Sequence, residues 1–538
     1  MNQADRLRPT QRDALLHNLK DGRTFDVAVI GGGATGLGVA LDAAARGYSV
    51  ALFESEDFAK GTSSRSTKLV HGGVRYLAQG NIALVREALH ERATVLRNAP
   101  HLAHRLAFVM PCYKLWEIPF YGAGLVMYDA LAGKRGLGKT SVLGPQGTLD
   151  ALPNVRTAGL KGAVKYWDGQ FDDARLAIAL GRTAAQLGAQ LLNYCGVTGL
   201  LHNDDGKVDG VVARDGETGE QFNVKARCII NATGVWVDGL RRQDDEHAGR
   251  EAEDIVAPSQ GVHVVVDREF MPSDHALIIP GTSDGRVLFT VPWLGKVIIG
   301  TTDTPRHDLS REPDPFREEL DFILRESSKY LNRAPTPADI RSIWVGLRPL
   351  VKPPKSAGTD TKALSREHTV LVSQSGMVTV TGGKWTTYRA MAADVLQQCI
   401  DRGLLPAGTA CTTDHLALVG AQRGMPVTHA LSDPPDIRAY GDESEAVESL
   451  PGAQNALGGG LTEAMVRFAA RYEYARRVED VLARRSRLLF LDAALAASMA
   501  GPVGRILQEE TGIDPEVEAF RALTRHYLHP ALLQGAAT

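Results

Sequence analysis

The fold is decided by a stretch near the start of the chain, residues 25–54, which reads FDVAVIGGGATGLGVALDAAARGYSVALFE. Its first part, the apolar run at 25–30, predicts a buried parallel strand that ends in three glycines. Small, helix-compatible residues follow from 34 to 46, and residues 49–53 predict the next strand. The stretch therefore predicts a complete βαβ unit and a Rossmann-type α/β fold.

The glycines of this unit carry a chemical meaning. Gly31, Gly33 and Gly36 form the pattern G-x-G-x-x-G at the turn from strand to helix. Gly31 permits a tight turn, Gly33 lets the backbone approach a pyrophosphate, and the start of the helix offers N–H groups to that anion. Glu54 ends the second strand, where it can accept hydrogen bonds from ribose hydroxyls. The order of these features predicts dinucleotide binding, and it leaves NAD and FAD open.

Whole-chain composition limits the class of protein. At 538 residues the chain is too long for one core, which predicts two or three domains. The hydrophobic fraction of 44% is typical of a globular protein, and a formal charge of −3 argues against a nucleic-acid partner. The five cysteines lack the CxxC spacing of a zinc site or redox dithiol, so we expect no metal and a reducing compartment.

The sequence also bears on location. No run of about 18 apolar residues is present, so a membrane span is not expected. The first residues, MNQADRLRPTQRDALLHNLKDG, lack the apolar segment of a secretory signal, and their acidic residues argue against a transit peptide. The sequence therefore favours the cytoplasmic side of the membrane.

Further strands and a change of pattern predict the domain organisation. Strand-like runs at 210–213, 228–230 and 262–266 predict a mixed-sheet domain. From Met465 to Leu482, apolar residues recur at three- and four-residue steps, which predicts one long amphipathic helix opening a helical domain. We expect four parts: an N-terminal extension at 1–24, interleaved dinucleotide-binding and mixed-sheet domains at 25–395, a linker at 396–460 and a C-terminal α-helical domain at 461–538.

The segment after the βαβ unit, residues 61–77, reads GTSSRSTKLVHGGVRYL and resembles flavin-dependent glycerol-3-phosphate dehydrogenases. The family's later signatures are matched by NATGVW at 231–236, GTTD at 300–303, GLRPL at 346–350 and GGKWTTYR at 382–389. The resemblance covers about residues 25 to 520. It implies an FAD-binding domain of the glutathione-reductase type, a mixed-sheet substrate domain and a helical C-terminal domain.

The resemblance also implies which residues contact FAD. They come from the βαβ unit, the hydroxyl-rich segment and two later glycine turns: Gly31, Gly33, Gly36, Glu54, Thr62, Ser63, Ser64, Lys68, His71, Gly73, Ala232, Gly234, Gly383 and Thr387.

The implied reaction is oxidation of sn-glycerol 3-phosphate to dihydroxyacetone phosphate by hydride transfer from C2 to FAD. A phosphorylated substrate calls for converging cations. By resemblance the substrate would contact Arg75, Tyr76, His263, Arg348, Arg366 and Lys384, with His263, Arg348 and Lys384 catalytic. We expect His263 to be a base that titrates near neutrality. The alternatives are a structural histidine and solvated surface arginines.

The family passes electrons to a membrane quinone, as an enzyme bound peripherally to the inner face of the cytoplasmic membrane. Aromatic and apolar residues at 116–128, followed by Lys134, Arg135 and Lys139, are typical of an interfacial segment, although a packed core helix explains them equally well. The sequence leaves open whether the chain forms a homodimer. The competing functions are an FAD-dependent amine or amino-acid oxidase, a non-catalytic or RNA-associated flavoprotein, and an NAD-linked dehydrogenase.

Overall fold

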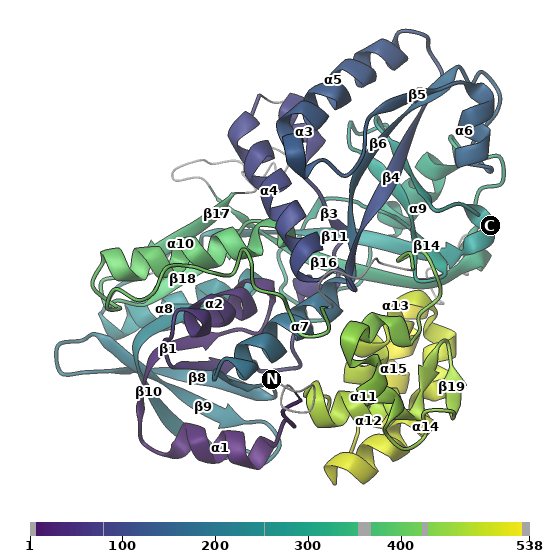
Figure 1. Cartoon of the computed structure of the whole chain (residues 1–538). Coiled ribbons are helices and arrows are strands. Elements are labelled where there is room, and N and C mark those ends of the chain that lie inside the picture. The colour runs from purple at the N-terminus through teal and green to yellow at the C-terminus, as the bar shows by residue number, and fades with distance from the viewer. Residues whose placement is uncertain (1–6, 79, 252, 353–366, 422–428, 530–538) are drawn as a thin grey trace.

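The computed structural model describes residues 7–78, 80–251, 253–352, 367–421 and 429–529 (Figure 1). Two large sheets lie beside a group of helices near the C-terminal end, drawn in yellow and yellow-green in Figure 1. The chain passes between the two sheets several times, so each sheet combines segments that are far apart in the sequence.

The first sheet confirms the βαβ unit. Its strand β1 (Thr24–Ile30) lies between β2 (Val50–Phe53) and β10 (Gln221–Asn231), and both neighbours run parallel to it. The outer strands β7 (Gln190–Leu192) and β18 (Val378–Gly382) continue the parallel order. Three helices share one hydrophobic core with these strands and cover the same face: α2 (Ala34–Ala45), α7 (Asp173–Gln186) and α10 (Tyr388–Asp401).

The second sheet is mixed, as expected. Strand β11 (Val256–Asp267) pairs antiparallel with β16 (Ile340–Val351) on one side and with β14 (Lys296–Gly300) on the other. Farther along, β12 (His275–Ile279) runs parallel to β4 (Ala103–Cys112). The strands β9 (Val208–Asp215), β10 and β11 lie where the sequence predicts strands.

Helices at the C-terminal end pack against this second sheet. Their core includes Trp293 and Trp344, which come from strands of the sheet. The principal helices are α12 (Glu463–Tyr472), α14 (Ala493–Thr511) and α15 (Val517–Leu528). The expected helical domain is confirmed, and its core is continuous with the sheet rather than separate from it.

The prediction of one long helix from Met465 to Leu482 is wrong. Helix α12 ends at Tyr472, Tyr474 has a left-handed backbone with φ of +61°, and a π-helical turn follows at Asp480–Arg485. Glu473 is fully buried and pairs with Arg175 of α7 at 2.9 Å. The chain turns here because the Glu473 carboxylate pairs with Arg175, which lies on a helix outside the C-terminal domain. The apolar pattern of the sequence does not reveal this partner.

Helices also occur near two predicted domain limits. The N-terminal extension contains α1 (Arg12–Lys20), and α10 continues to Asp401, past the predicted boundary at 395. Within the predicted linker, short helices span Ile437–Glu443 and Ser444–Glu448. The limits at 24, 395 and 460 stay a prediction, and the boundary at 395 falls inside a helix.

Candidate active site

The glycine turn at the end of β1 allows only residues without a side chain. Gly31 has a φ of +109°, and a Cβ there would lie 2.6 Å from the carbonyl oxygen of Ala232 at the end of β10. A Cβ on Gly33 would lie 3.1 Å from the hydroxyl of Ser63, and Gly36 packs directly against the backbone of Gly31. The pattern G-x-G-x-x-G thus reflects close backbone packing at the N-terminus of α2.

A cleft of about 390 Å³ opens beside this turn. Its walls come from the ends of β1, β2, β10 and β18 and from the hydroxyl-rich segment. The expected cofactor contacts that line it are Gly31, Gly33, Glu54, Thr62, Ser63, Ala232, Gly234 and Gly383. The ends of parallel strands in such sheets are where ligands bind, so the structure brings these residues together in a suitable place.

Glu54 lies at the end of β2, as the sequence predicts. Its carboxylate accepts hydrogen bonds from the backbone N–H groups of Gly32 at 2.7 Å and Glu56 at 2.9 Å. Burial raises the pKa of the Glu54 carboxyl, and these hydrogen bonds oppose that rise. The residue is therefore held rigidly in the cleft wall with an acceptor group available.

The hydroxyl-rich segment joins the two halves of the cleft. Ser63 accepts a hydrogen bond from the N–H of Ala34 at the start of α2, at 2.8 Å, and Trp385 donates to the Ser63 carbonyl at 2.8 Å. The hydroxyl of Thr62 donates to the carbonyl of Leu347 in β16 at 2.5 Å. These contacts attach the segment to the dinucleotide fold on one side and to the mixed sheet on the other.

The remaining expected cofactor contacts do not line the cleft: Gly36, Ser64, Lys68, His71, Gly73 and Thr387. Ser64 and Thr387 are buried, and the N–H of His71 donates to the hydroxyl of Thr386 at 3.2 Å. Gly73, with φ of +76°, lies against the ring of Tyr76. A direct contact of these six residues with a cofactor stays a prediction.

Lys68 has a different environment from the one the sequence suggests. Its ammonium group is fully buried, pairs with Asp173 of α7 at 2.7 Å and lies 4.6 Å from the centre of the Trp344 ring. Arg487 of the C-terminal domain pairs with the same carboxylate at 3.0 Å. Burial, opposed by Asp173, lowers the pKa of Lys68 to about 7. Lys68 thus connects the hydroxyl-rich segment to the C-terminal domain.

His263 lies in the interior of β11, where only 2% of its surface is exposed. Its ring stacks on Trp344 with the centroids 4.0 Å apart, and its Nε2 lies 3.0 Å from the hydroxyl of Thr67. Burial holds the pKa of His263 well below its ordinary value, and the positive charges of Lys68 and Arg348 add to this effect. The expectation of a pKa near neutrality is therefore wrong. The ring is neutral at physiological pH, and it gains a proton only at a lower pH than an ordinary histidine does.

Arg348 has an anionic partner within the protein. Its guanidinium lies 3.4 Å from the carboxylate of Asp303 and donates to the Thr302 carbonyl at 3.0 Å and to the Thr301 hydroxyl at 3.2 Å. A Cβ on Gly261, in the neighbouring strand β11, would strike this guanidinium. Gly261 therefore leaves the space that Arg348 occupies, and about a fifth of the arginine side chain, 21%, remains exposed.

The other expected substrate contacts are only partly described. Lys384 lines the cleft, and its ammonium group lies 3.8 Å from the centre of the Tyr76 ring. Arg75 lies in α3 (Val74–Ala78), but its side chain lies outside the described part of the structure. Arg366 lies outside the described residues altogether. Their roles stay predictions.

Several residues contact the site although the sequence alone assigns them no role in it. Arg311 lines the cleft although it lies in a loop far from any glycine motif. Thr67 and Trp344 contact His263, and Asp303 contacts Arg348. The motif at 300–303 locates Asp303 at a strand end, but only the pairing of β11 with β14 and β16 places it beside Arg348.

Two family models match the chain. One is described as FAD dependent oxidoreductase and covers residues 26–389, and the other, the C-terminal domain of alpha-glycerophosphate oxidase, covers residues 411–518. The probable mitochondrial glycerol-3-phosphate dehydrogenase of Caenorhabditis elegans is 41% identical, over 94% of this chain and 73% of its own length. The mitochondrial glycerol-3-phosphate dehydrogenase of Homo sapiens is 40% identical over the same shares. The chain belongs to the FAD-dependent glycerol-3-phosphate dehydrogenases.

Solved structures agree with this assignment. A glycerol-3-phosphate dehydrogenase from Bacillus halodurans, complexed with FAD, superposes with a TM-score of 0.75 at 29% identity and covers 96% of this chain and 98% of its own. An L-proline dehydrogenase from P. horikoshii reaches a TM-score of 0.51 at 18% identity, which shows a shared fold alone. The expected fold of an FAD-dependent glycerol-3-phosphate dehydrogenase is confirmed, and the amine-oxidase alternative is not supported.

The cleft fits the cofactor of the glycerol-3-phosphate dehydrogenase family. At its floor a Cβ on Gly31 would strike backbone, and one on Gly33 would crowd the Ser63 hydroxyl, which suits the close approach of a pyrophosphate to the backbone. Glu54 supplies the acceptor for ribose hydroxyls at one end. At another side, Gly382 and Gly383 have φ values of +81° and +73° and precede the turn that starts α10. The residues present therefore suit FAD.

Proposed function

We propose that this protein oxidises sn-glycerol 3-phosphate to dihydroxyacetone phosphate with FAD as its cofactor. The observation that carries the proposal is a pair of cations close to the cleft and to His263. Lys384 lines the cleft, and Arg348 is near enough to His263 for its charge to lower the pKa of that ring. A phosphate that is close to doubly charged binds best to such groups. The relatives named above are glycerol-3-phosphate dehydrogenases, which supports the choice of substrate.

In this reaction C2 of the substrate loses a hydride and its hydroxyl loses a proton. Arg348 and Lys384 would bind the phosphate and orient C2. His263 would hold the hydroxyl proton, since its ring is neutral and can accept one. A bound phosphate would raise the pKa of His263, because nearby negative charge favours the protonated ring. When bound, FAD supplies the acceptor for the hydride.

The backbone near Lys384 favours the same chemistry. Gly382 and Gly383 line the cleft just before α10 begins, and the positive end of a helix stabilises negative charge. Trp236 and Trp385 also line the cleft, and such apolar rings exclude water from it. The protein's own groups thus favour negative charge in a cleft from which water is excluded.

Anaerobic titration of the purified protein with glycerol 3-phosphate tests the proposal. The oxidised-flavin absorbance band should bleach with this substrate and persist with proline or another amino acid. Bleaching by an amino acid alone would support an oxidase of the same fold instead. Absence of bound flavin after supplementation with FAD would contradict the proposal entirely.

We further propose that the reduced enzyme passes electrons to a membrane quinone while bound peripherally to the inner face of the cytoplasmic membrane. Support comes from α5 (Glu117–Ala132), where Leu125 and Tyr128 are buried but Phe120 and Val126 are 65% and 58% exposed. Trp116, just before the helix, is 56% exposed. The basic residues that follow at 134–139 suit an anionic lipid surface. No helix in the described ranges is long and apolar enough to cross a bilayer.

Substitution on α5 tests the membrane proposal. The double variant Trp116→Ser and Phe120→Ser should bind phospholipid vesicles roughly tenfold or more weakly, because two large apolar side chains no longer enter the lipid. Its turnover with a soluble electron acceptor should stay at the wild-type rate. Leu187→Ser, at a 44% exposed leucine elsewhere, is the matched control. Equal vesicle binding by the double variant and this control would contradict the proposal.

A further inference from the structure

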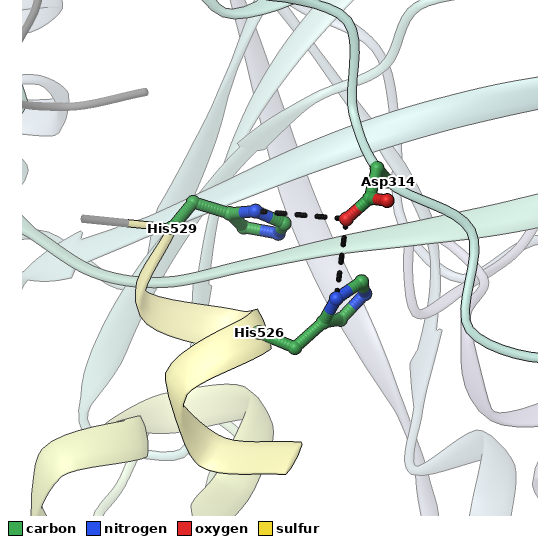
Figure 2. A group of neighbouring side chains, drawn as sticks. All are labelled: Asp314, His526 and His529. Carbon is green, nitrogen blue, oxygen red and sulfur yellow. Dashed lines mark ion pairs between the residues drawn. The ribbon is translucent and has the colours of Figure 1, made fainter. Parts of the chain in front are cut away.

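Two histidines and an aspartate converge where the C-terminal helix meets a loop of the mixed sheet (Figure 2). Asp314 lies in the loop before α9 (Arg317–Ser328), whereas His526 lies in the last turn of α15 and His529 directly follows that helix. The Nδ1 atoms of His526 and His529 lie 3.1 Å and 4.0 Å from the same carboxylate oxygen of Asp314. One atom from each residue lies within 4.8 Å of the others.

We propose that Asp314, His526 and His529 form a binding site for a divalent transition-metal ion such as Zn²⁺. Two imidazole nitrogens and one carboxylate oxygen are ligands that Zn²⁺ prefers, and three protein ligands leave a position for water. A hydrogen bond to Asp314 explains the position of only one histidine. The distance of 3.1 Å from His526 suits such a bond, whereas the distance of 4.0 Å from His529 is too long for one. A metal ion between the three atoms would use both histidines.

Local structure holds the three side chains in place. Asp314 lies between Pro313 and Pro315, and both prolines restrict the loop backbone. His529 follows the helix end with a left-handed backbone, φ of +42°, and its ring lies 4.9 Å from that of His526.

The surrounding charges are compatible with a cation. Arg306 donates to the backbone carbonyl of Asp314 at 2.6 Å, and its own charge is balanced by Asp308 at 2.6 Å. The carboxylate of Asp314 is 69% exposed, so an ion can reach it from solvent.

The position of the site suggests what the ion would do. In the same loop, Arg311 lines the cofactor cleft and Glu312 pairs with Arg65 of the hydroxyl-rich segment at 2.6 Å. Tyr527, between the two histidines, donates to Glu312 at 3.2 Å. A metal ion would therefore fasten α15 of the C-terminal domain to the loop that completes the cleft wall.

Metal titration of the FAD-loaded, untagged protein tests this site after chelator treatment and dialysis. By calorimetry we expect the wild type to bind one Zn²⁺ per chain, and Co²⁺ at the same site should give the visible absorption of imidazole coordination. Asp314→Asn and His526→Gln should each weaken Zn²⁺ binding by at least roughly tenfold, as loss of a ligand does. Zn²⁺ should also raise the Tm of the wild type and not that of these variants.

His415→Gln is the matched control, because His415 and Asp414 form another exposed pair at 3.2 Å that lies outside the group of three ligands found among the described residues. This variant should bind Zn²⁺ as the wild type does. The proposal is overturned if the wild type binds no stoichiometric Zn²⁺, or if Asp314→Asn and His526→Gln bind it as tightly as His415→Gln. Flavin absorbance confirms in each case that the variant is folded and loaded.

Discussion

His263 lies between the indole of Trp344 and the hydroxyl of Thr67, and both neighbours come from segments far from it in the sequence. The motif context singles out the histidine itself, yet its pKa depends on burial and on the charges of Lys68 and Arg348. Sequence reasoning assigns an ordinary pKa because it sees no neighbours. At the scale of single residues, the sequence predicts which residue takes part, but it does not predict the pKa of that residue's side chain.

The depressed pKa leads to a prediction about pH. Because the pKa of His263 lies well below 6.5, its neutral form persists as pH falls through the range where an ordinary histidine would gain a proton. We therefore expect the ratio of kcat/KM for wild type to that for His263→Asn to stay constant from about pH 5.5 to 8. Ionisation of the substrate phosphate cancels in this ratio.

His263→Asn should also slow flavin reduction by about 10²- to 10⁴-fold while weakening substrate binding much less, as loss of a proton acceptor does. Stopped-flow reduction over a range of substrate concentrations separates the two effects. Unchanged reduction would exclude His263 as the base, and a ratio that declines with a single-proton slope near pH 6.5 would contradict the depressed pKa.

Arg348 carries the second prediction at this scale. Arg348→Ala should lower kcat/KM for glycerol 3-phosphate, because the substrate phosphate loses a charged hydrogen-bond donor. The loss should correspond to about 2 to 4 kcal/mol of transition-state stabilisation. Flavin content should be unchanged, since Arg348 does not line the cleft that suits FAD. Arg341→Ala, in the same strand but paired with Asp267 at the surface, is the control. If both variants keep wild-type kcat/KM, the proposed phosphate site is wrong.

At the scale of elements, the βαβ unit was fully predictable. Its strands and helix form where the local pattern places them, because a buried parallel strand, a glycine turn and a helix of small residues are each determined by neighbours in the sequence. The helix predicted over Met465–Leu482 failed for the opposite reason. Its interruption follows from the buried pair of Glu473 with Arg175, which joins residues 298 positions apart.

The glycine turn allows a prediction with a close control. Gly31→Ala should lose bound FAD and lower the Tm, because the added Cβ would lie 2.6 Å from the Ala232 carbonyl and the backbone φ is +109°. Gly47→Ala, at the other end of α2, also has a positive φ, +89°, but its Cβ would meet no atom within 4 Å. It should cost only about 1 to 2 kcal/mol of unfolding free energy and keep FAD. Equal flavin content in both variants, measured after denaturation, would contradict the steric argument.

For the whole molecule, the main feature is a buried charge network between the C-terminal domain and the dinucleotide fold. Asp57, just after β2, pairs with both Arg484 and Arg485 of the π-helical turn. Glu479 pairs with Arg484 at 2.7 Å and with Lys60 at 2.9 Å. Buried pairs of this kind stabilise an interface only when every member is present, so the two domains depend on each other.

Acid should weaken this interface. Burial alone would raise the pKa of Glu479, but Arg484 and Lys60 outweigh it and lower the pKa from 4.5 to about 2. The carboxylate therefore contributes stability that is fully present above pH 4.5 and is lost as pH falls toward 2. Glu479→Gln should lower the Tm at neutral pH and flatten its dependence on pH in this acid range.

Calorimetric Tm values across the acid range measure this effect. Glu518→Gln, which alters a carboxylate that is 78% exposed and pairs with Arg521, is the control and should follow the wild type. A Glu479→Gln variant whose Tm declines with acid as steeply as that of the wild type would show that this ion pair does not control the interface.

The sequence by itself determined the class of this protein: the dinucleotide fold, the likeness to FAD-dependent glycerol-3-phosphate dehydrogenases and several of the cleft-lining residues. These depend on local patterns, in which a few neighbouring residues set the backbone. Only the tertiary structure decided the depressed pKa of His263, the pairing of Arg348 with Asp303, the break after α12 and the meeting of Asp314 with two histidines at the end of α15. Each of these arises from contacts between distant segments, because charge, burial and ligand geometry are properties of side chains that meet only when the chain has folded.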